Sequence, residues 1–244
     1  LKESPMAKPA MSHTPSSWTL DRRRSLLREV PLFAGLSEET VDSVAQRLMP
    51  RHYLRGEMIF ARGMPADAFN LLAEGKVKIV RETEEGRQVI LRLIEPRQMF
   101  GVSGGWGELR YPASAYALED SVVLRLTAWE FNRLLSTHPD LAMSVIRDLG
   151  RRLRQAEERI LELQTAGVEC RLARAVLRML EDSPDGATIN LSRQDLADLT
   201  GTTLSTTSRI LSSWHRRGIV LAGRERVRVV DLDELEGIAL RPSQ

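Results

Sequence analysis

Residues 192–211, SRQDLADLTGTTLSTTSRIL, constrain the fold of this chain more than any other segment. Ser192 and Asp195 have the spacing of a helix N-cap and of the third residue after it, so we expect a helix to begin here. Gly201 suits the left-handed backbone conformation that ends a helix in a tight turn. One of the two threonines that follow can cap a second helix. The segment therefore predicts two helices joined by a short glycine turn, which is a helix-turn-helix.

The second of these helices carries side chains typical of a helix that reads DNA. Short hydroxyl side chains allow close approach to bases and phosphates, and Arg209 can form two hydrogen bonds with a guanine. We expect DNA contacts from Thr203, Ser205, Thr206, Ser208 and Arg209, and further along the helix from Ser212 and Arg216. The alternative is an ordinary surface helix on which these serines and threonines are merely tolerated.

The flanks of this helix are basic, although the whole chain is nearly neutral. Between residues 202 and 230 there are six arginines and one acidic residue, Glu225, whereas the chain has 35 basic and 33 acidic residues. The run VLAGRERVRVVD predicts a two-stranded hairpin with arginines at its tip, a wing beside the helices. Such a basic patch suits the phosphate backbone of double-stranded DNA, the predicted partner.

Between about Arg51 and Thr127 the apolar residues follow a different period. Short runs with β-branched or alternating apolar positions are separated by glycines: EMIFARG, FNLLAEGKVKIVRET, QVILRLIE and SVVLRLT. Short strands with glycine turns at this spacing predict a small antiparallel β-roll or barrel. Before this region, Ser37 suits the start of a helix whose apolar face contains Val41, Val44, Ala45 and Leu48.

A long helical stretch follows, with one narrow apolar stripe between charged flanks. Its apolar residues recur in steps of four and three, which is a heptad repeat. We call this set the heptad stripe: Ala142, Ile146, Leu149, Leu153, Ala156, Ile160 and Leu163. A parallel coiled coil between two copies of the chain is the favoured interpretation, with Ile146, Leu149, Leu153, Ala156 and Ile160 as dimerisation residues. The alternative is a helix that lies on its own domain.

The predicted fold class is α+β, and the predicted boundaries follow from these patterns. Residues 1–24 form a disordered tail, 25–137 a β-roll, 138–166 a dimerisation helix and 167–244 a winged helix-turn-helix. Cys170 is the only cysteine, which excludes an internal disulfide and a metal or iron–sulfur site built from several cysteines of this chain. No nucleophile–base pair or phosphate loop is evident, so an enzyme is not expected. Without a signal peptide or an apolar run of about 20 residues, the prediction is a cytoplasmic protein with no membrane partner.

The motifs together resemble the CRP/FNR family of bacterial transcription regulators. The resemblance runs from about Leu32 to Leu235 and is carried by GEMIFARG, LLAEGKVKI, MFG, YPASAYALEDS and above all SRQDLADLTGTTLSTTSRIL. It implies a β-roll sensor domain, a long dimerisation helix and a C-terminal winged helix. It also implies a homodimer on a palindromic promoter site, with RNA polymerase as a further partner.

Several roles can be carried over from the family to residues of this chain. Arg209 falls where the family has its guanine-reading arginine, and Ser208 matches the serine of a Ser-Arg pair found in one branch. Arg193 falls where members place an arginine near phosphate. Members commonly have a glutamate four residues before the guanine-reading arginine, but here that position is Ser205. The outer contacts to the DNA site are therefore expected to differ.

The sensor region departs from the members that bind cyclic AMP. Those members have a glutamate directly after the Phe-Gly pair and an arginine before a Ser-Ala or Thr-Ala pair. Here these positions hold Val102 and Ala113. Because a buried phosphate without a guanidinium partner would be costly, we expect a signal other than cyclic AMP. The candidate signal-binding pocket comprises Leu93, Phe100, Val102, Ser114 and Tyr116.

The remaining branch of the family includes heme-dependent sensors of nitric oxide, which RYPASAYALEDS resembles. Heme is therefore a possible cofactor; the sequence shows no other cofactor and no metal site. The candidate axial ligands are His13, His52, His138, His215, Cys170 and several methionines. A heme- or redox-based sensor whose main activity is ligand binding is the alternative function. Cys170 itself is either a buried apolar residue or a redox switch.

Overall fold

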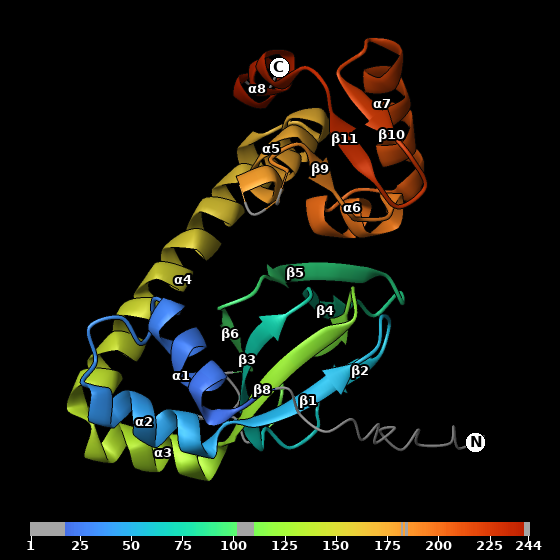
Figure 1. The fold of residues 1–244 in the computed structure, drawn as a ribbon. Helices are drawn as coiled ribbons and strands as arrows, with labels where there is room; N and C mark the ends of the chain where they lie inside the picture. Colours follow the sequence, from blue (N-terminus) through green and yellow to red (C-terminus); the bar gives the residue numbers. More distant parts are fainter. Residues whose placement is uncertain (1–17, 102–109, 182, 184, 242–244) are drawn as a thin grey trace, which may run out of the picture. The chain divides into compact units, whose positions relative to one another are not determined.

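The computed structural model describes residues 18–101, 110–181, 183 and 185–241 (Figure 1). These form two compact units, residues 1–80 with 93–148 and residues 81–92 with 149–244. The helices are α1 (Leu20–Glu29), α2 (Glu38–Arg47), α3 (Ala128–Thr137), α4 (Pro139–Thr165), α5 (Val168–Glu181), α6 (Arg193–Thr200), α7 (Leu204–Arg216) and α8 (Leu232–Leu240). The strands are β1 (Met49–Tyr53), β2 (Met58–Phe60), β3 (Ala68–Glu74), β4 (Val77–Glu82), β5 (Gln88–Ile94), β6 (Met99–Phe100), β7 (Ser114–Ala117), β8 (Ser121–Thr127), β9 (Thr188–Ile189), β10 (Val220–Ala222) and β11 (Val227–Val229).

Two helices precede the roll, and the second begins as the sequence predicts. The hydroxyl of Ser37 accepts a hydrogen bond from the backbone N–H of Thr40 at 3.2 Å, which caps α2. The first helix corrects the prediction of a disordered tail, because α1 begins at Leu20, inside the range 1–24. The many charged residues of this segment are typical of a tail, but Leu26 and Leu27 are buried in the core and anchor the helix there. The rest of that predicted tail, residues 1–17, lies outside the described residues.

Within the described residues the roll has two four-stranded sheets, which confirms the predicted α+β fold with an antiparallel β domain. Their strand orders are β1-β8-β3-β6 and β2-β7-β4-β5. Strand β8 pairs antiparallel with β1 and β3, and β7 pairs antiparallel with β2 and β4. In β3 every residue from Ala68 to Ala73 is buried. A strand covered on both faces needs apolar residues at consecutive positions, which explains why FNLLA does not alternate.

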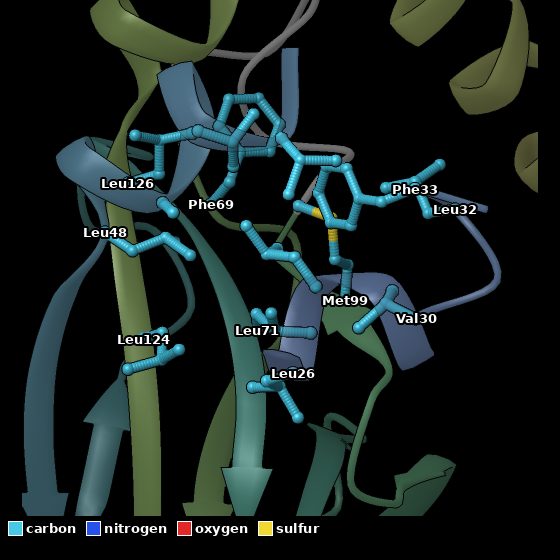
Figure 2. Packing of buried hydrophobic residues seen from close by; sticks show 14 of the residues in the cluster. Leu26, Val30, Leu32, Phe33, Leu48, Phe69, Leu71, Met99, Leu124 and Leu126 are labelled. Atoms are coloured by element: carbon cyan, nitrogen blue, oxygen red, sulfur yellow. The ribbon is translucent and has the colours of Figure 1, made fainter. Parts of the chain in front are cut away.

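The larger core of the roll lies between its first sheet and the helices around it. In Figure 2, Phe69 and Leu71 of β3 lie with Leu124 of β8 among side chains from α1 and the segment after it, including Leu26. Helices α2 and α3 contribute further apolar side chains to this core, and α4 adds Leu141 and Val145. Burial of this size, at about 25 cal/mol per Å² of apolar surface, is the main source of stability in such a domain.

A second, smaller core fills the roll with aromatic rings. Phe60 stacks on Tyr111 with ring centroids 3.8 Å apart and on Phe100 at 6.0 Å. The Tyr111 hydroxyl donates to the carbonyl oxygen of Ala68 at 2.8 Å. Burial raises the pKa of Tyr111, and the nearby carboxylate of Asp67 raises it further. The hydroxyl therefore stays protonated and remains a donor.

Helix α4 presents two different faces along its 27 residues. Near its start Leu141 and Val145 are buried in the larger core. The heptad stripe lies on another face, and its large side chains are exposed, from 37% for Leu149 to 61% for Leu153. An exposed row of large apolar side chains is typical of a surface that pairs with another helix.

The C-terminal part contains helices and a small sheet of strand order β10-β11-β9 (Figure 1). Strands β10 and β11 pair antiparallel, with Val220 opposite Val229. The turn between them closes where the N–H of Gly223 donates to the carbonyl oxygen of Arg226 at 2.7 Å. This hairpin is the wing that the sequence predicts.

Candidate nucleic-acid interface

The helix-turn-helix is built by three local devices at the expected positions. The hydroxyl of Ser192 accepts from the N–H of Asp195 at 3.0 Å and begins α6. Gly201 ends α6 at φ 67° and ψ 37°, which is the left-handed conformation. Thr203 caps α7, accepting from the N–H of Thr206 at 3.2 Å. All three predictions of a helix boundary are confirmed.

The buried face of α7 is held by packing and by one polar contact. Thr207, Leu211 and Trp214 of α7 have no exposed surface. The indole N–H of Trp214 donates to a carboxylate oxygen of Glu169 on α5 at 2.8 Å. With this face buried, the opposite face of α7 must point outward.

The outward face carries four of the predicted DNA contacts. Ser205, Arg209, Ser212 and Arg216 follow each other in steps of four, three and four, so they lie on one side of the helix. Ser205, Arg209 and Arg216 are exposed, and Ser212 is partly buried. Two hydroxyls and two guanidinium groups therefore face the same direction, as a reading surface requires.

The other predicted contacts are placed less directly. The hydroxyls of Thr203 and Thr206 lie 3.0 Å apart and are engaged in the cap of α7. Ser208 is partly buried, and Arg193 is partly buried at the first position of α6. Thr203 and Thr206 therefore have a structural role in capping α7. Their contact with DNA remains a prediction.

The wing adds exposed cations, but one of the six arginines is used elsewhere. Arg224, Arg226 and Arg228 are exposed on or beside the hairpin. Arg217 instead forms an ion pair with Glu234 of α8. A local count of charges includes Arg217 in the basic flank, because such a count does not include a carboxylate 17 residues further along the chain.

Sequence reasoning overlooked one side chain beside this face. Leu204 is the first residue of α7, and its side chain is 46% exposed. An exposed leucine at the start of a reading helix can contact the methyl group of a thymine. The signal was present in the sequence, because Leu204 directly follows the predicted cap residue, but an apolar side chain does not stand out among hydroxyls and arginines.

Comparisons with known proteins agree with this geometry. A model of the cyclic nucleotide-binding domain matches residues 50–138, and a model of the Crp-like helix-turn-helix domain matches residues 170–238. A cyclic AMP receptor protein from Thermus thermophilus is 34% identical over 86% of this chain and 96% of that protein. This chain belongs to the CRP family of transcription regulators. Its helix-turn-helix is a DNA-binding module, and its relatives are regulators and not enzymes.

Other members resemble this CRP-family regulator about as closely and carry different names. A global nitrogen regulator from Synechococcus elongatus is 31% identical over 75% of this chain and 86% of that protein. The crystal structure of a CRP-family transcriptional regulator from Thermus thermophilus has a TM-score of 0.68 at 27% identity, over 78% of this chain and 96% of that one. Because one relative is named for cyclic AMP and another for nitrogen, membership does not identify the signal. No helix within the described residues is long and apolar enough to span a membrane.

The predicted signal pocket of this CRP-family regulator stays a prediction, and its described members lie on different faces of their strands. Phe100 is buried in the smaller core with Ala115 of β7 and Ile94 of β5. Ser114 and Tyr116 alternate with the buried Ala115 on β7, and Leu93 directly precedes the buried Ile94 on β5. The side chains of Leu93, Ser114 and Tyr116 therefore lie on strand faces that point away from this core. A single lining made of all five residues is therefore not formed by one strand face and stays a prediction. Val102 lies outside the described residues.

The described histidines and the cysteine among the candidate heme ligands lie at different places in the fold. His138 caps the end of α3, where its Nδ1 lies 3.1 Å from the carbonyl oxygen of Leu134. His215 places Nδ1 3.2 Å from the carbonyl oxygen of Val220, and the Cys170 thiol donates to the carbonyl oxygen of Ala239 at 3.1 Å. His52 is partly buried in β1, and His13 lies outside the described residues. Within the described ranges, no group of three or more His, Cys, Asp or Glu side chains could hold a metal ion.

Proposed function

We propose that this regulator acts as a homodimer that binds a palindromic DNA site through α7, under the control of a signal other than cyclic AMP sensed in the β-roll. The observation that carries the proposal is the outward face of α7, with Ser205, Arg209, Ser212 and Arg216 on one side. Arg209 lies near its centre and is exposed. A guanidinium in this position can form two hydrogen bonds with a guanine in the major groove.

The exposed heptad stripe supports a dimer. Two copies that pair along α4 would each supply one reading helix, and a two-fold axis between them would match a palindromic site. The exposed arginines of the wing would then bind phosphates on both sides of the site. RNA polymerase is the expected protein partner of such a regulator once it is bound at a promoter.

The composition of the roll supports a signal that lacks a phosphate. Ala113, at the position expected for a phosphate-binding arginine, is buried and has no charge to offer. The smaller core is filled by Phe60, Phe100 and Tyr111 of the chain itself. An anion brought into this apolar interior without a cationic partner would lose its hydration without replacement.

The experiment that tests the proposal is selection of binding sites from random duplex DNA by the wild-type protein. We expect a two-fold symmetric site with a guanine in each half and a steep fall of affinity with added salt. Calorimetry with millimolar cyclic AMP should show no saturable heat. A selection that returns no common sequence would contradict the assignment of α7, and micromolar binding of cyclic AMP would contradict the assignment of the signal.

A further inference from the structure

Two arginines from outside the helix-turn-helix donate hydrogen bonds to backbone carbonyl groups at the end of α6. Arg159, near the end of α4, donates through one guanidinium nitrogen to the carbonyl oxygen of Leu199. Arg171, near the start of α5, donates through Nε to the carbonyl oxygen of Thr200 at 3.1 Å and through another nitrogen to the carbonyl oxygen of Ala166 at 2.7 Å. All of these residues belong to the compact unit that contains residues 149–244.

These carbonyls lie at a sensitive point of the chain. The last four carbonyl groups of a helix lack partners within it, and they form the negative end of its dipole. Cations that donate to them therefore stabilise the end of α6 and define its direction. Leu199 and Thr200 directly precede the turn at Gly201, and α7 begins three residues later, at Leu204. The direction of α7 depends on where this turn is held.

A buried carboxylate keeps Arg159 in place. Glu162 is only 7% exposed, and its Oε2 accepts from Arg159 at 2.6 Å and from Arg178 at 3.4 Å. Its other oxygen, Oε1, has no hydrogen-bond partner among the residues that the structure describes. An unpaired oxygen on a buried charge lowers stability, so packing alone does not explain a glutamate here.

The charges around this carboxylate are held close together. Burial lowers the pKa of Arg171, and the neighbouring charge of Arg159 lowers it further, while Glu162 opposes both effects. Two guanidinium groups are thus kept near the same helix end against their mutual repulsion. Removing one of these arginines removes a hydrogen bond to the end of α6, so the position of α6 should become less well defined.

We propose that Arg159 is a positioning residue for DNA recognition: it holds the end of α6, and through the turn at Gly201 it orients α7. Glu162 fixes the guanidinium from behind. Arg159 also directly precedes Ile160 of the heptad stripe, so its side chain links the last turns of α4 to the helix that leads into α7. This inference rests on the proposed reading face of α7, since it explains how that face is aimed.

The test compares specific and non-specific DNA binding of matched variants. Affinities are measured for a duplex with one selected half-site and for a scrambled duplex, so that changes in dimerisation do not enter the ratio. Arg159→Met keeps an unbranched side chain but removes the charge and the donors, and Arg159→Lys keeps the charge and one donor group. Glu162→Gln removes the charge behind Arg159. Arg154→Met is the control, because Arg154 is exposed on the same helix and the change in net charge is the same.

We expect Arg159→Met to lower the ratio of specific to non-specific affinity about tenfold, the effect of one charge-assisted hydrogen bond. Arg159→Lys should recover part of the loss, Glu162→Gln should cause a smaller loss, and Arg154→Met should leave the ratio unchanged. A merely structural role would lower the melting temperature and leave the ratio as in the wild type, and that result would overturn the proposal. If Arg159→Met does not fold, an unchanged ratio in both Arg159→Lys and Glu162→Gln overturns it equally. A wild-type protein without any preference for the half-site would instead contradict the proposed function.

Discussion

The reading helix α7 and the strand β7 of the roll both carry small and hydroxyl side chains, but they use them in opposite ways. On α7 the hydroxyls and arginines gather on one outward face, opposite the buried Trp214. On β7 the small Ala115 faces the aromatic core, whereas Ser114 points away and accepts from the backbone N–H of Arg62 at 2.9 Å. The comparison teaches that an outward face of α7 leaves its hydroxyls and arginines open to a partner, whereas β7 turns its small residue Ala115 toward the aromatic core of the roll.

The largest expected effect concerns neither region directly but the pairing of two copies. Leu153→Asp puts a charge in the middle of the heptad stripe, where it would face its own copy across the two-fold axis. Unpaired charges in a desolvated interface cost several kcal/mol, comparable with the free energy that holds many dimers together. We expect monomers by light scattering and loss of cooperative binding to a palindrome, with both regions still folded.

Gln155→Asp is the control for this prediction, because it adds the same charge on α4 outside the heptad stripe. It should leave the oligomeric state unchanged. A Leu153→Asp variant that remains dimeric at micromolar concentration would show that the dimer interface lies elsewhere.

A smaller effect tests the outward face of α7. Arg209→Ala should remove specific binding and leave a weaker, salt-sensitive background, at a cost of about 1–3 kcal/mol per half-site. Arg209→Lys keeps the charge but lacks the rigid planar fork of donors, so it should lose part of the sequence preference and retain the salt dependence. Selection experiments that return the same site for wild type and Arg209→Ala would refute the role of Arg209.

The crowded interior of the roll can be tested at Gly101. This residue has φ 78°, and an added Cβ would lie 2.9 Å from the side-chain nitrogen of Asn70 and 3.3 Å from a ring carbon of Tyr111. Gly101→Ala should lower the free energy of unfolding by roughly 1–3 kcal/mol, through backbone strain and this contact. Gly56→Ala is the matched control, because Gly56 has φ 84° but no described atom within 4 Å of the added Cβ. Equal losses in chemical denaturation would show that the interior of the roll has room to adjust.

The smallest effect is expected in a surface turn of the DNA-binding unit. Hydrogen bonds from Thr188, Ala187 and Ser183 hold the pKa of Asp185 well below its usual range. Because the folded-state pKa is depressed, this stabilisation is fully present above the unfolded pKa of about 3.9 and is lost as pH falls toward the folded value. The melting temperature of wild type should exceed that of Asp185→Asn at neutral pH, and the difference should shrink below about pH 4. A difference that does not depend on pH would contradict an origin in the charge.

Local features could be predicted from the sequence because short-range rules determine them. The caps at Ser192 and Thr203 and the glycine at position 201 satisfy backbone groups within four residues, so their partners are visible in the sequence itself. The heptad stripe and the outward face of α7 follow from the period of the α-helix alone. The sequence by itself therefore determined the helix-turn-helix, the wing, the antiparallel roll and the family to which they belong.

What the tertiary structure decided are the contacts between residues far apart in the chain. The start of α1 within a predicted tail depends on a core that receives Leu26 and Leu27, and the face of Ser114 depends on which side of its sheet is covered. Arg217 forms an ion pair with Glu234 and is therefore not available to the basic flank, and Arg159 donates to a carbonyl oxygen 40 residues further along the chain. The periodicity of the sequence does not predict these long-range contacts, because each depends on how elements far apart in the chain pack together in the folded protein.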